Sequence, residues 1–208
     1  FVVESHGHVI AFHPSGAERL AALLALIDGA QTSLGLSFYI FARDASGVRV
    51  RDALTAAAQR GVRVSVILDG FGAEADAEFF AEMIAAGGRF ASFLGRWSRR
   101  ALIRNHQKIV IADGKHAMLG GFNVADDYFA VPGPESWTDL GFTITGPVVE
   151  RITAWFAELE SWTANDKAQL LALSRRVRAF KPGAEPVRLL IGGPSRRLSG
   201  WARTISAD

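Results

Sequence analysis

The most informative stretch of the sequence is NHQKIVIADGKHAMLG, residues 105–120. It contains two apolar runs, Lys108–Ala112 and His116–Leu119, joined by Asp113-Gly114. Asp-Gly between two apolar runs is a strong signal for a β-hairpin. Because side chains on a strand alternate between faces, we expect His106 and Lys108 to project together, about 7 Å apart at ~3.3 Å per residue.

An imidazole beside an ammonium is unsuited to a protein core, because neither group is cheap to bury without a partner. The same pair suits a phosphodiester: Lys108 would neutralise a non-bridging oxygen while His106 attacks phosphorus or transfers a proton. Asp113 is an odd number of residues from both, so its side chain is expected on the opposite face. We interpret Asp113 as a structural carboxylate that fixes the Asp-Gly turn.

The rest of the chain alternates between predicted helices and strands. Apolar residues at helical spacing predict helices around 20–27, 50–57, 75–86 and 148–162. Predicted strands cover 9–12, 33–41, 62–68, 89–93, 140–145 and 187–191. This alternation predicts an α/β fold in which a mixed sheet is covered by helices on both faces. Loops at strand ends are common ligand sites in such folds, so the active site is expected near Asp69, His106 and Asn123.

Composition indicates a globular protein but does not identify its ligand. The 208 residues are 49% hydrophobic and 21% charged, which indicates a globular chain and excludes a disordered one. A net charge of +2 with a pI near 9.3 suits an anionic partner, either phospholipid or nucleic acid. The absence of cysteine excludes a disulfide framework and a thiolate zinc site. No apolar run approaches the roughly 18 residues that a membrane-spanning helix needs.

The pattern His-x-Lys-x4-Asp at His106, Lys108 and Asp113 resembles the signature of the phospholipase D superfamily. Gly120-Gly121-Phe122-Asn123 is similar to the Gly-Gly-x-Asn element that follows it in that family. Further segments resemble the N-terminal half of bacterial cardiolipin synthases: Tyr39-Ile40-Phe41 with Asp44, Gln59–Val64, Leu68-Asp69-Gly70, Trp137-Thr138-Asp139 and Gly146-Pro147-Val148. Their order along the chain makes the resemblance specific, whereas the three motif positions alone are weak evidence.

The resemblance implies a role for each matching position. His106 would be one of two catalytic histidines, of which one forms a phosphohistidine and the other protonates the leaving alcohol. Lys108 and Asn123 would hold phosphoryl oxygens, and Asp139 would accept a hydrogen bond from the far nitrogen of the histidine. Asp113 completes the catalytic set, and no metal or other cofactor is expected. Substrate-binding candidates are Tyr39, Asp69, Arg104, Gly120 and Gly121.

The sequence departs from the family in having a single motif, because no second His-x-Lys occurs. Sites of this family need two such motifs, so the second half-site is expected from residues beyond 208 or from another copy of the chain. The tail, with a predicted short strand at 187–191 and then Pro194, resembles the opening unit, which has Pro14 after its first predicted strand. We therefore expect a phospholipase D-like domain over 1–180 and, over 181–208, a linker and the start of a second, truncated repeat.

The leading hypothesis is phosphatidyl transfer of the cardiolipin synthase type, from a phospholipid to an alcohol acceptor. The resemblance places such a protein at the cytoplasmic face of the bacterial inner membrane, bound peripherally. Two alternatives stay open: a homodimeric endonuclease on DNA or RNA, and a non-catalytic lipid-binding domain. Basic residues before the motif suit a lipid surface or a nucleic-acid backbone: Arg96, Arg99, Arg100 and Arg104, with Trp97. His6-Gly7-His8 lacks a third metal ligand nearby and reads better as a solvated strand.

Overall fold

A computed structural model describes residues 1–93, 105–131, 133–134, 136–164, 170–180 and 186–191. The described residues form one mixed sheet of eight strands in the order β1-β2-β8-β7-β6-β3-β4-β5. The strands are β1 (Val2–Ser5), β2 (His8–His13), β3 (Ser33–Phe38), β4 (Arg63–Asp69), β5 (Arg89–Phe93), β6 (Ile109–Ala112), β7 (His116–Gly120) and β8 (Gly141–Thr145). β3, β4 and β5 are parallel, and the other neighbours are antiparallel.

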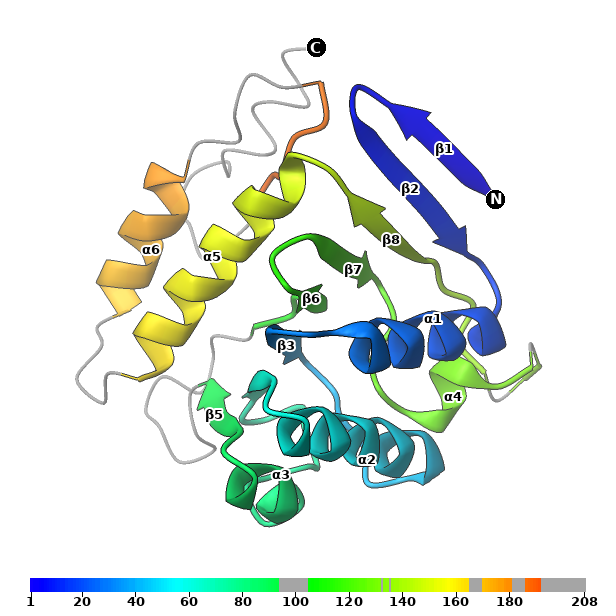
Figure 1. The fold of residues 1–208 in the computed structure, drawn as a ribbon, viewed down its shortest axis with the longest axis vertical. Coiled ribbons are helices and arrows are strands. Elements are labelled where there is room, and N and C mark those ends of the chain that lie inside the picture. The colour runs from blue at the N-terminus through cyan, green and yellow to red at the C-terminus, as the bar shows by residue number, and fades with distance from the viewer. Residues whose placement is uncertain (94–104, 132, 135, 165–169, 181–185, 192–208) are drawn as a thin grey trace.

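Helices cover both faces of the sheet (Figure 1). On one face lie α1 (Gly16–Gly29), α2 (Ala45–Gln59), α3 (Ala81–Ala85) and α4 (Asp126–Phe129), and on the other lie α5 (Val148–Thr163) and α6 (Leu170–Ala179). Each face has its own buried core: Leu23, Leu36 and Leu54 belong to the first, and Ile111, Ile152 and Trp155 to the second. The predicted α/β architecture with helices on both faces is therefore confirmed.

Local sequence explains where the helices begin. At the start of α1, Ser15 and Glu18 form a reciprocal capping box, in which each side chain accepts from the other residue's main-chain N–H. Asp44 caps α2 by accepting from Gly47 N at 2.8 Å, and its second oxygen accepts from Asp126 N at 2.6 Å. Asp44 thus joins the starts of α2 and α4.

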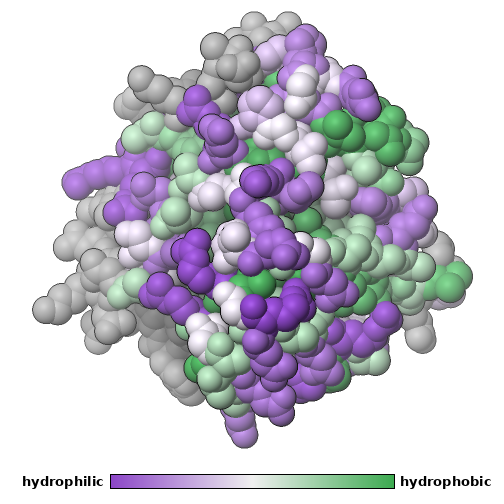
Figure 2. Space-filling model, viewed as in Figure 1, coloured by the Kyte–Doolittle hydropathy of each residue, from purple (hydrophilic) through white to green (hydrophobic). Residues whose placement is uncertain are grey.

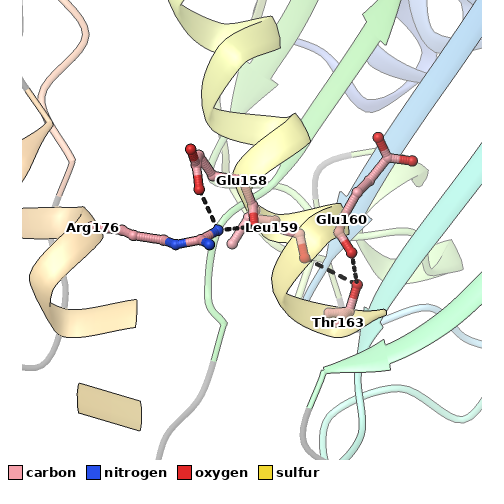
Figure 3. A network of polar contacts seen from close by, with 5 residues as sticks. All are labelled: Glu158, Leu159, Glu160, Thr163 and Arg176. Atoms are coloured by element: carbon pink, nitrogen blue, oxygen red, sulfur yellow. Dashed lines mark hydrogen bonds and ion pairs between the residues drawn. The ribbon is translucent and has the colours of Figure 1, made fainter. Parts of the chain in front are cut away.

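α6 packs on α5 through polar and aromatic contacts. Figure 3 shows the Arg176 guanidinium of α6 turned toward the carboxylate of Glu158 on α5, with which it forms an ion pair. Nearby, the Thr163 hydroxyl donates to main-chain carbonyls one turn back, those of Leu159 and Glu160 at 3.0 and 3.1 Å. Because the ion pair is solvent-exposed, its contribution to stability is small. The edge-to-face pair of Trp155 on α5 and Phe180, the residue after α6, adds apolar contact.

Hydrophobic atoms also gather on the surface over the β1–β2 hairpin, in the upper right of Figure 2. Phe1, Val2 and Val3 are exposed there, and the Phe1 ring stacks on Phe12 with 4.6 Å between centroids. β1 is an edge strand of the described sheet.

Three predictions of local structure are wrong. The helix expected over 75–86 begins only at Ala81, because the N–H groups of Glu74 and Ala75 are bonded to Phe41 O rather than within a helix. The strand expected over 187–191 does not form, although its apolar side chains pack against the second core. Residues 105–108 lie ahead of β6 instead of within it, so His106 and Lys108 are not strand residues. The expected start of a repeat after residue 191 lies outside the described residues.

Asp113 lies in the β6–β7 turn with φ of 56°. Its carboxylate accepts from the main-chain N–H groups of Gln31, Thr32 and Ser33 at 2.7–3.2 Å and from the Thr32 hydroxyl at 2.8 Å. Burial alone would raise the pKa of this carboxyl, but the hydrogen bonds from Ser33, Gln31 and Thr32 outweigh it and bring the pKa well below its usual range. Asp113 therefore fastens the hairpin to the start of β3.

Replacing this carboxylate tests its structural role. We expect Asp113→Ala to lower the free energy of unfolding at pH 7 by about 1–2 kcal/mol, because several main-chain N–H groups lose a charged but partly exposed acceptor. Since folding lowers the pKa of Asp113, its contribution is present above the unfolded-state pKa and is lost as pH falls through the folded-state value. Urea titration at pH 7 and pH 3 measures both effects. Asp28→Ala, at an exposed position on α1, is the control, and equal stability of the two variants would contradict the assignment.

Candidate active site

The strand register brings the motif residues to one edge of the sheet. Ile109, the first residue of β6, pairs with Ser37 near the carboxyl end of β3, and Gly120 at the end of β7 pairs with Gly141 at the start of β8. Residues 39–40, 69–72, 105–108, 121–123 and 139–140 extend from these same strand ends. The expected gathering of Asp69, His106 and Asn123 is therefore found, and Asp113 lies at the opposite end of β6.

His106 and Lys108 lie side by side at this edge. The Lys108 ammonium donates to His106 O at 2.8 Å, and its Nζ lies 2.9 Å from His106 Nδ1. Lys108 is 5% exposed while His106 is exposed, so the imidazole faces solvent above a buried cation. The Tyr39 ring borders both, with its centroid 4.6 Å from the His106 ring and 5.6 Å from Lys108 Nζ.

The contact with Lys108 determines which ring nitrogen of His106 carries the proton. An ammonium has donors only, so a charged Lys108 makes Nδ1 the acceptor and leaves the ring proton on Nε2. In this state Nε2–H of His106 can donate a hydrogen bond, but transfer of a proton to a leaving alcohol needs the ring protonated on both nitrogens. To attack phosphorus through Nε2, the ring needs its proton on Nδ1, which requires Lys108 to leave that nitrogen.

Burial and charge lower both pKa values in the pair. Burial lowers the pKa of Lys108 to about 8, against an opposing effect of the Asp139 carboxylate. Burial is also the larger cause of a lowered pKa at His106; the Lys108 charge lowers it further and Asp69 raises it. The neutral form of His106 is therefore favoured more than in a free histidine, and Lys108 loses its proton more easily than a free lysine does.

Asp69 fixes the segment that carries the motif. It is 1% exposed, and its two oxygens accept from three main-chain N–H groups: Phe71 and Gly72 at 3.0 and 3.1 Å, and Asn105 at 2.8 Å. The Asn105 side chain in turn donates to Ser37 Oγ at 2.9 Å, and both side chains are buried. Asp69, expected to bind substrate, is thus occupied by main-chain donors, and it acts on His106 through its charge.

Asn123 is also buried, at 2% exposure. Its Oδ1 accepts from Ile40 N at 3.0 Å, and its side chain is hydrogen-bonded to the Tyr128 hydroxyl. The side-chain amide nitrogen is the donor through which Asn123 could contact a phosphoryl oxygen. Asn123 therefore connects the loop after β3 to α4 at the edge of the site.

Asp139 contacts the glycine pair rather than His106. Its Oδ1 accepts from Leu140 N at 2.7 Å, and a Cβ at position 121 would lie 2.5 Å from the same oxygen. Gly121 is needed for this close approach, and a Cβ at Gly120 would meet Leu140 O at 2.4 Å. No hydrogen bond between His106 and Asp139 occurs among the described residues, so the expected pairing stays a prediction. The two glycines make room for the 139–140 segment.

Several residues at the site were missed from the sequence. Arg19 of α1 is 2% exposed and donates to three main-chain carbonyls, one of which is Asp139 O. Gln107, between the two motif residues, accepts from Trp155 Nε1 at 2.8 Å and so ties the motif to α5. An arginine in an amphipathic helix normally predicts a solvated position, and nothing in the pattern around Arg19 or Gln107 distinguishes them.

Two other predictions concern the basic residues before the motif and the histidines at positions 6 and 8. Arg104 and the basic residues 96–100 lie outside the described residues. His8 is buried and does not lie on a solvated face: its Nε2 accepts from Val148 N at 3.0 Å at the start of α5. Within the described ranges, no cluster of three or more His, Asp or Glu side chains is arranged to hold a metal ion.

Comparison with known proteins agrees with this geometry. Residues 23–160 match the family model described as cardiolipin synthase, PLD-like domain. The chain belongs to this family. It is 34% identical over 169 residues to cardiolipin synthase B of Shigella flexneri, covering 78% of this chain and 40% of that protein. It is 36% identical over 147 residues to the major cardiolipin synthase ClsA of Bacillus subtilis strain 168, covering 68% of this chain and 30% of that protein.

Two solved structures share the fold. Phosphatidylserine synthase from Haemophilus influenzae Rd KW20 matches with a TM-score of 0.61 at 15% identity, over 76% of this chain and 37% of that one. The phospholipase D family member Nuc from Salmonella typhimurium matches with a TM-score of 0.55 at 21% identity, over 73% of this chain and 91% of that one. The chain thus spans less than half the length of the curated cardiolipin synthases that it matches.

The electrostatic coupling in the cardiolipin synthase-like site is measurable on one proton. We expect His106 to titrate below the usual histidine pKa of about 6.5. Lys108→Met should raise the pKa of His106 by removing a neighbouring cation, and Asp69→Asn should lower it by removing an anion. NMR titration of the imidazole C–H resonances, assigned with His106→Gln, gives each value. Shifts of the same sign in both variants would contradict the arrangement.

Proposed function

We propose that this chain supplies one half of the active site of a phosphatidyltransferase of the cardiolipin synthase type. The observation that carries the proposal is the exposed His106 imidazole, 2.9 Å from a buried Lys108 cation at the strand ends. Membership of the cardiolipin synthase, PLD-like domain family supports phosphatidyl transfer over other phosphodiester chemistry. Hydrolysis is the same reaction with water as the acceptor.

In the proposed reaction, His106 and a second histidine divide two tasks. One histidine attacks phosphorus through a ring nitrogen and forms a P–N bond while the P–O bond to the leaving alcohol breaks. The other histidine donates the proton that this alcohol takes up. The acceptor alcohol then returns a proton to the histidine that protonated the leaving alcohol and attacks phosphorus, and the P–N bond breaks. Lys108 and Asn123 stabilise the charge on the non-bridging oxygens.

The Lys108–His106 contact gives substrate binding a further consequence. A non-bridging oxygen offers the ammonium a charged acceptor, which attracts Lys108 Nζ more strongly than a neutral imidazole nitrogen does. When Nζ moves to the phosphoryl oxygen, Nδ1 of His106 is released. The ring can then adopt the tautomer that attacks through Nε2, with a carboxylate such as Asp139 as the acceptor for Nδ1–H.

The second half-site is proposed to come from outside residues 1–208. The motif His-x-Lys occurs once in these residues. Two sources are possible, the remainder of a longer polypeptide or a second copy of the chain, and the greater length of the curated relatives favours the first. Asp113 takes no direct part in this proposal, because its carboxylate is bonded to main-chain groups at the other end of β6.

The proposed substrate is a phospholipid at a membrane surface, with an alcohol as the acceptor. The names of the curated relatives support this substrate class. None of the described helices is both long and apolar enough to cross a bilayer. Separately, we propose a peripheral position at the cytoplasmic face of the bacterial inner membrane, which is supported by the family membership alone.

Product analysis with phosphatidylglycerol vesicles tests the function. The full-length protein should convert this lipid to a diphosphatidyl product and release an alcohol, and His106→Ala should reduce turnover by about a thousandfold or more. His116→Ala, an exposed histidine at the opposite end of the hairpin, should retain activity. Unchanged turnover in His106→Ala would contradict the proposed function. Cleavage of oligonucleotides with no lipid turnover would establish the nuclease alternative instead.

The lowered pKa of Lys108 predicts how activity depends on pH. Binding of an anionic phosphodiester requires the ammonium form, so kcat/KM should fall as pH rises through about 8. Lys108→Arg keeps its charge at all these pH values, so its basic limb should move upward even though its overall rate is lower. The pH profile of kcat/KM is the measurement. A wild-type basic limb that coincides with that of Lys108→Arg would contradict the assignment.

A further inference from the structure

Arg19 is the largest fully buried side chain of the described residues, and it has no ion-pair partner among them. Its Nη1 donates to Pro14 O at 2.6 Å and to Asp139 O at 2.5 Å, and its Nη2 donates to Tyr128 O at 2.7 Å. Its Nε, also buried, has no hydrogen-bond partner in the described part of the chain. A buried guanidinium balanced by carbonyl dipoles is costly to keep for stability alone, since apolar side chains of similar volume commonly serve a core as well.

The three carbonyls belong to separate segments that meet beside the site. Pro14 precedes α1, Tyr128 belongs to α4, and Asp139 is the last residue but one before β8. Tyr128 is hydrogen-bonded to Asn123, while Asp139 lies against Gly121 and acts on the charge of Lys108. The planar fork of Arg19 therefore holds both ends of the α4–β8 connection at a fixed separation.

Packing confirms that the guanidinium has little freedom. The Arg19 stem lies over Gly141, where a Cβ would come within 3.1 Å of Arg19 Cγ. A Cβ at Gly16, one turn earlier on α1, would meet the carbonyl of Phe129 at 2.5 Å. The first turn of α1 is thus pressed against the main chain that follows Tyr128, and the position of this turn sets the position of Asp139.

We propose that Arg19 is a positioning residue of the half-site, which fixes the segment that carries the Asp139 carboxylate by binding the main-chain carbonyls of Tyr128 and Asp139. The proposal rests on the proposed function of this site. Arg19 touches no reacting atom, and it acts through the segments that carry Tyr128 and Asp139. Besides Asp139, the polar groups of the described residues that lie near the Lys108 ammonium are the His106 imidazole and main-chain oxygen and the Tyr39 ring.

The test uses Arg19→Met and Arg19→Lys in the full-length protein. Loss of the fork should lower kcat by about 10- to 100-fold, as small misplacements of catalytic groups do, while KM changes by no more than about twofold. Because Asp139 raises the pKa of Lys108, its displacement should also move the basic limb of the pH profile to lower pH. A purely structural role would not move that limb. Arg19→Lys, which keeps one donor group, should give a smaller effect than Arg19→Met.

Two controls make the result specific. Arg60→Met removes a guanidinium that also binds main-chain carbonyls, those of Ile27 and Asp28 at 3.3 and 3.1 Å, but far from the site along α1, and it should leave the pH profile unchanged. In an Asp139→Asn background, Arg19→Met should produce no further shift of the basic limb, because both changes remove the same influence on Lys108. An additional shift of full size would overturn the proposal.

The outcomes for this inference and for the proposed function are separable. If the wild-type protein lacks transferase activity, the proposed function fails, and the pKa of Lys108 is then read directly by ¹³C NMR of the reductively methylated protein. A Lys108 pKa lower in Arg19→Met than in wild type would still support the positioning role. An unchanged Lys108 pKa, or failure of both Arg19 variants to fold, would assign Arg19 to stability and overturn the inference.

Discussion

The antiparallel pairing of β6 with β3 is the constraint on which the site depends. β3 is bonded on one side to parallel β4 and on the other to antiparallel β6, so the carboxyl ends of β3 and β4 meet the beginning of β6. The next hairpin then returns β7 to the same edge and lets β8 start from it. A purely parallel sheet would have separated Asn123 and Asp139 from His106 by a strand length. The mixed topology of the sheet therefore brings segments that are far apart in the sequence to the same edge.

Two carboxylates hold this pairing at its opposite ends. Asp113 bonds the main chain of residues 31–33, where β3 starts, and Asp69 bonds the N–H of Asn105, ahead of β6. Each accepts at least three main-chain N–H groups, which are charge-assisted hydrogen bonds and stronger than neutral ones. Asp113 of the motif and Asp69, the last residue of β4, therefore have the same structural role. They fix where β6 begins and ends, and so where His106 and Lys108 stand.

Hydrophobic periodicity correctly predicted those helices and layers whose positions are set by the packing of apolar side chains. The apolar face of the last predicted helix, from Val148 to Trp162, is buried as expected, and the α/β layers follow from the alternation of elements. Asp113 is separated from the histidine and lysine by the length of β6, whereas parity had assumed one continuous strand and predicted only opposite faces. The end of the apolar run at Asp69 also located the edge of the site, because strands end where polar side chains must be satisfied.

Sequence reasoning failed where main-chain hydrogen bonds go to side chains or to distant loops. Residues 105–108 alternate like a strand, but Asn105 N is bonded to Asp69, so the ladder starts later. The N–H groups of Glu74 and Ala75 are bonded to Phe41 O, which delays α3. Arg19 could not be found, because its partners are carbonyl groups at positions 14, 128 and 139, and every residue has a carbonyl group. Such contacts leave no trace in residue type.

Two cations at the site, Lys108 and Arg19, are buried without an ion-pair partner among the described residues. Lys108 and Arg19 are both nearly inaccessible, and burial lowers the pKa of each, while the Asp139 carboxylate acts against that effect at both. The ion pairs of the described residues lie on the surface instead, where they contribute little to stability. An unneutralised cation at low dielectric is unfavourable until an anion binds beside it. A phosphodiester, the proposed substrate, is such an anion. Its binding would recover the free energy that the fold loses in burying Lys108, and the buried cation attracts the phosphoryl group without any rearrangement of the protein.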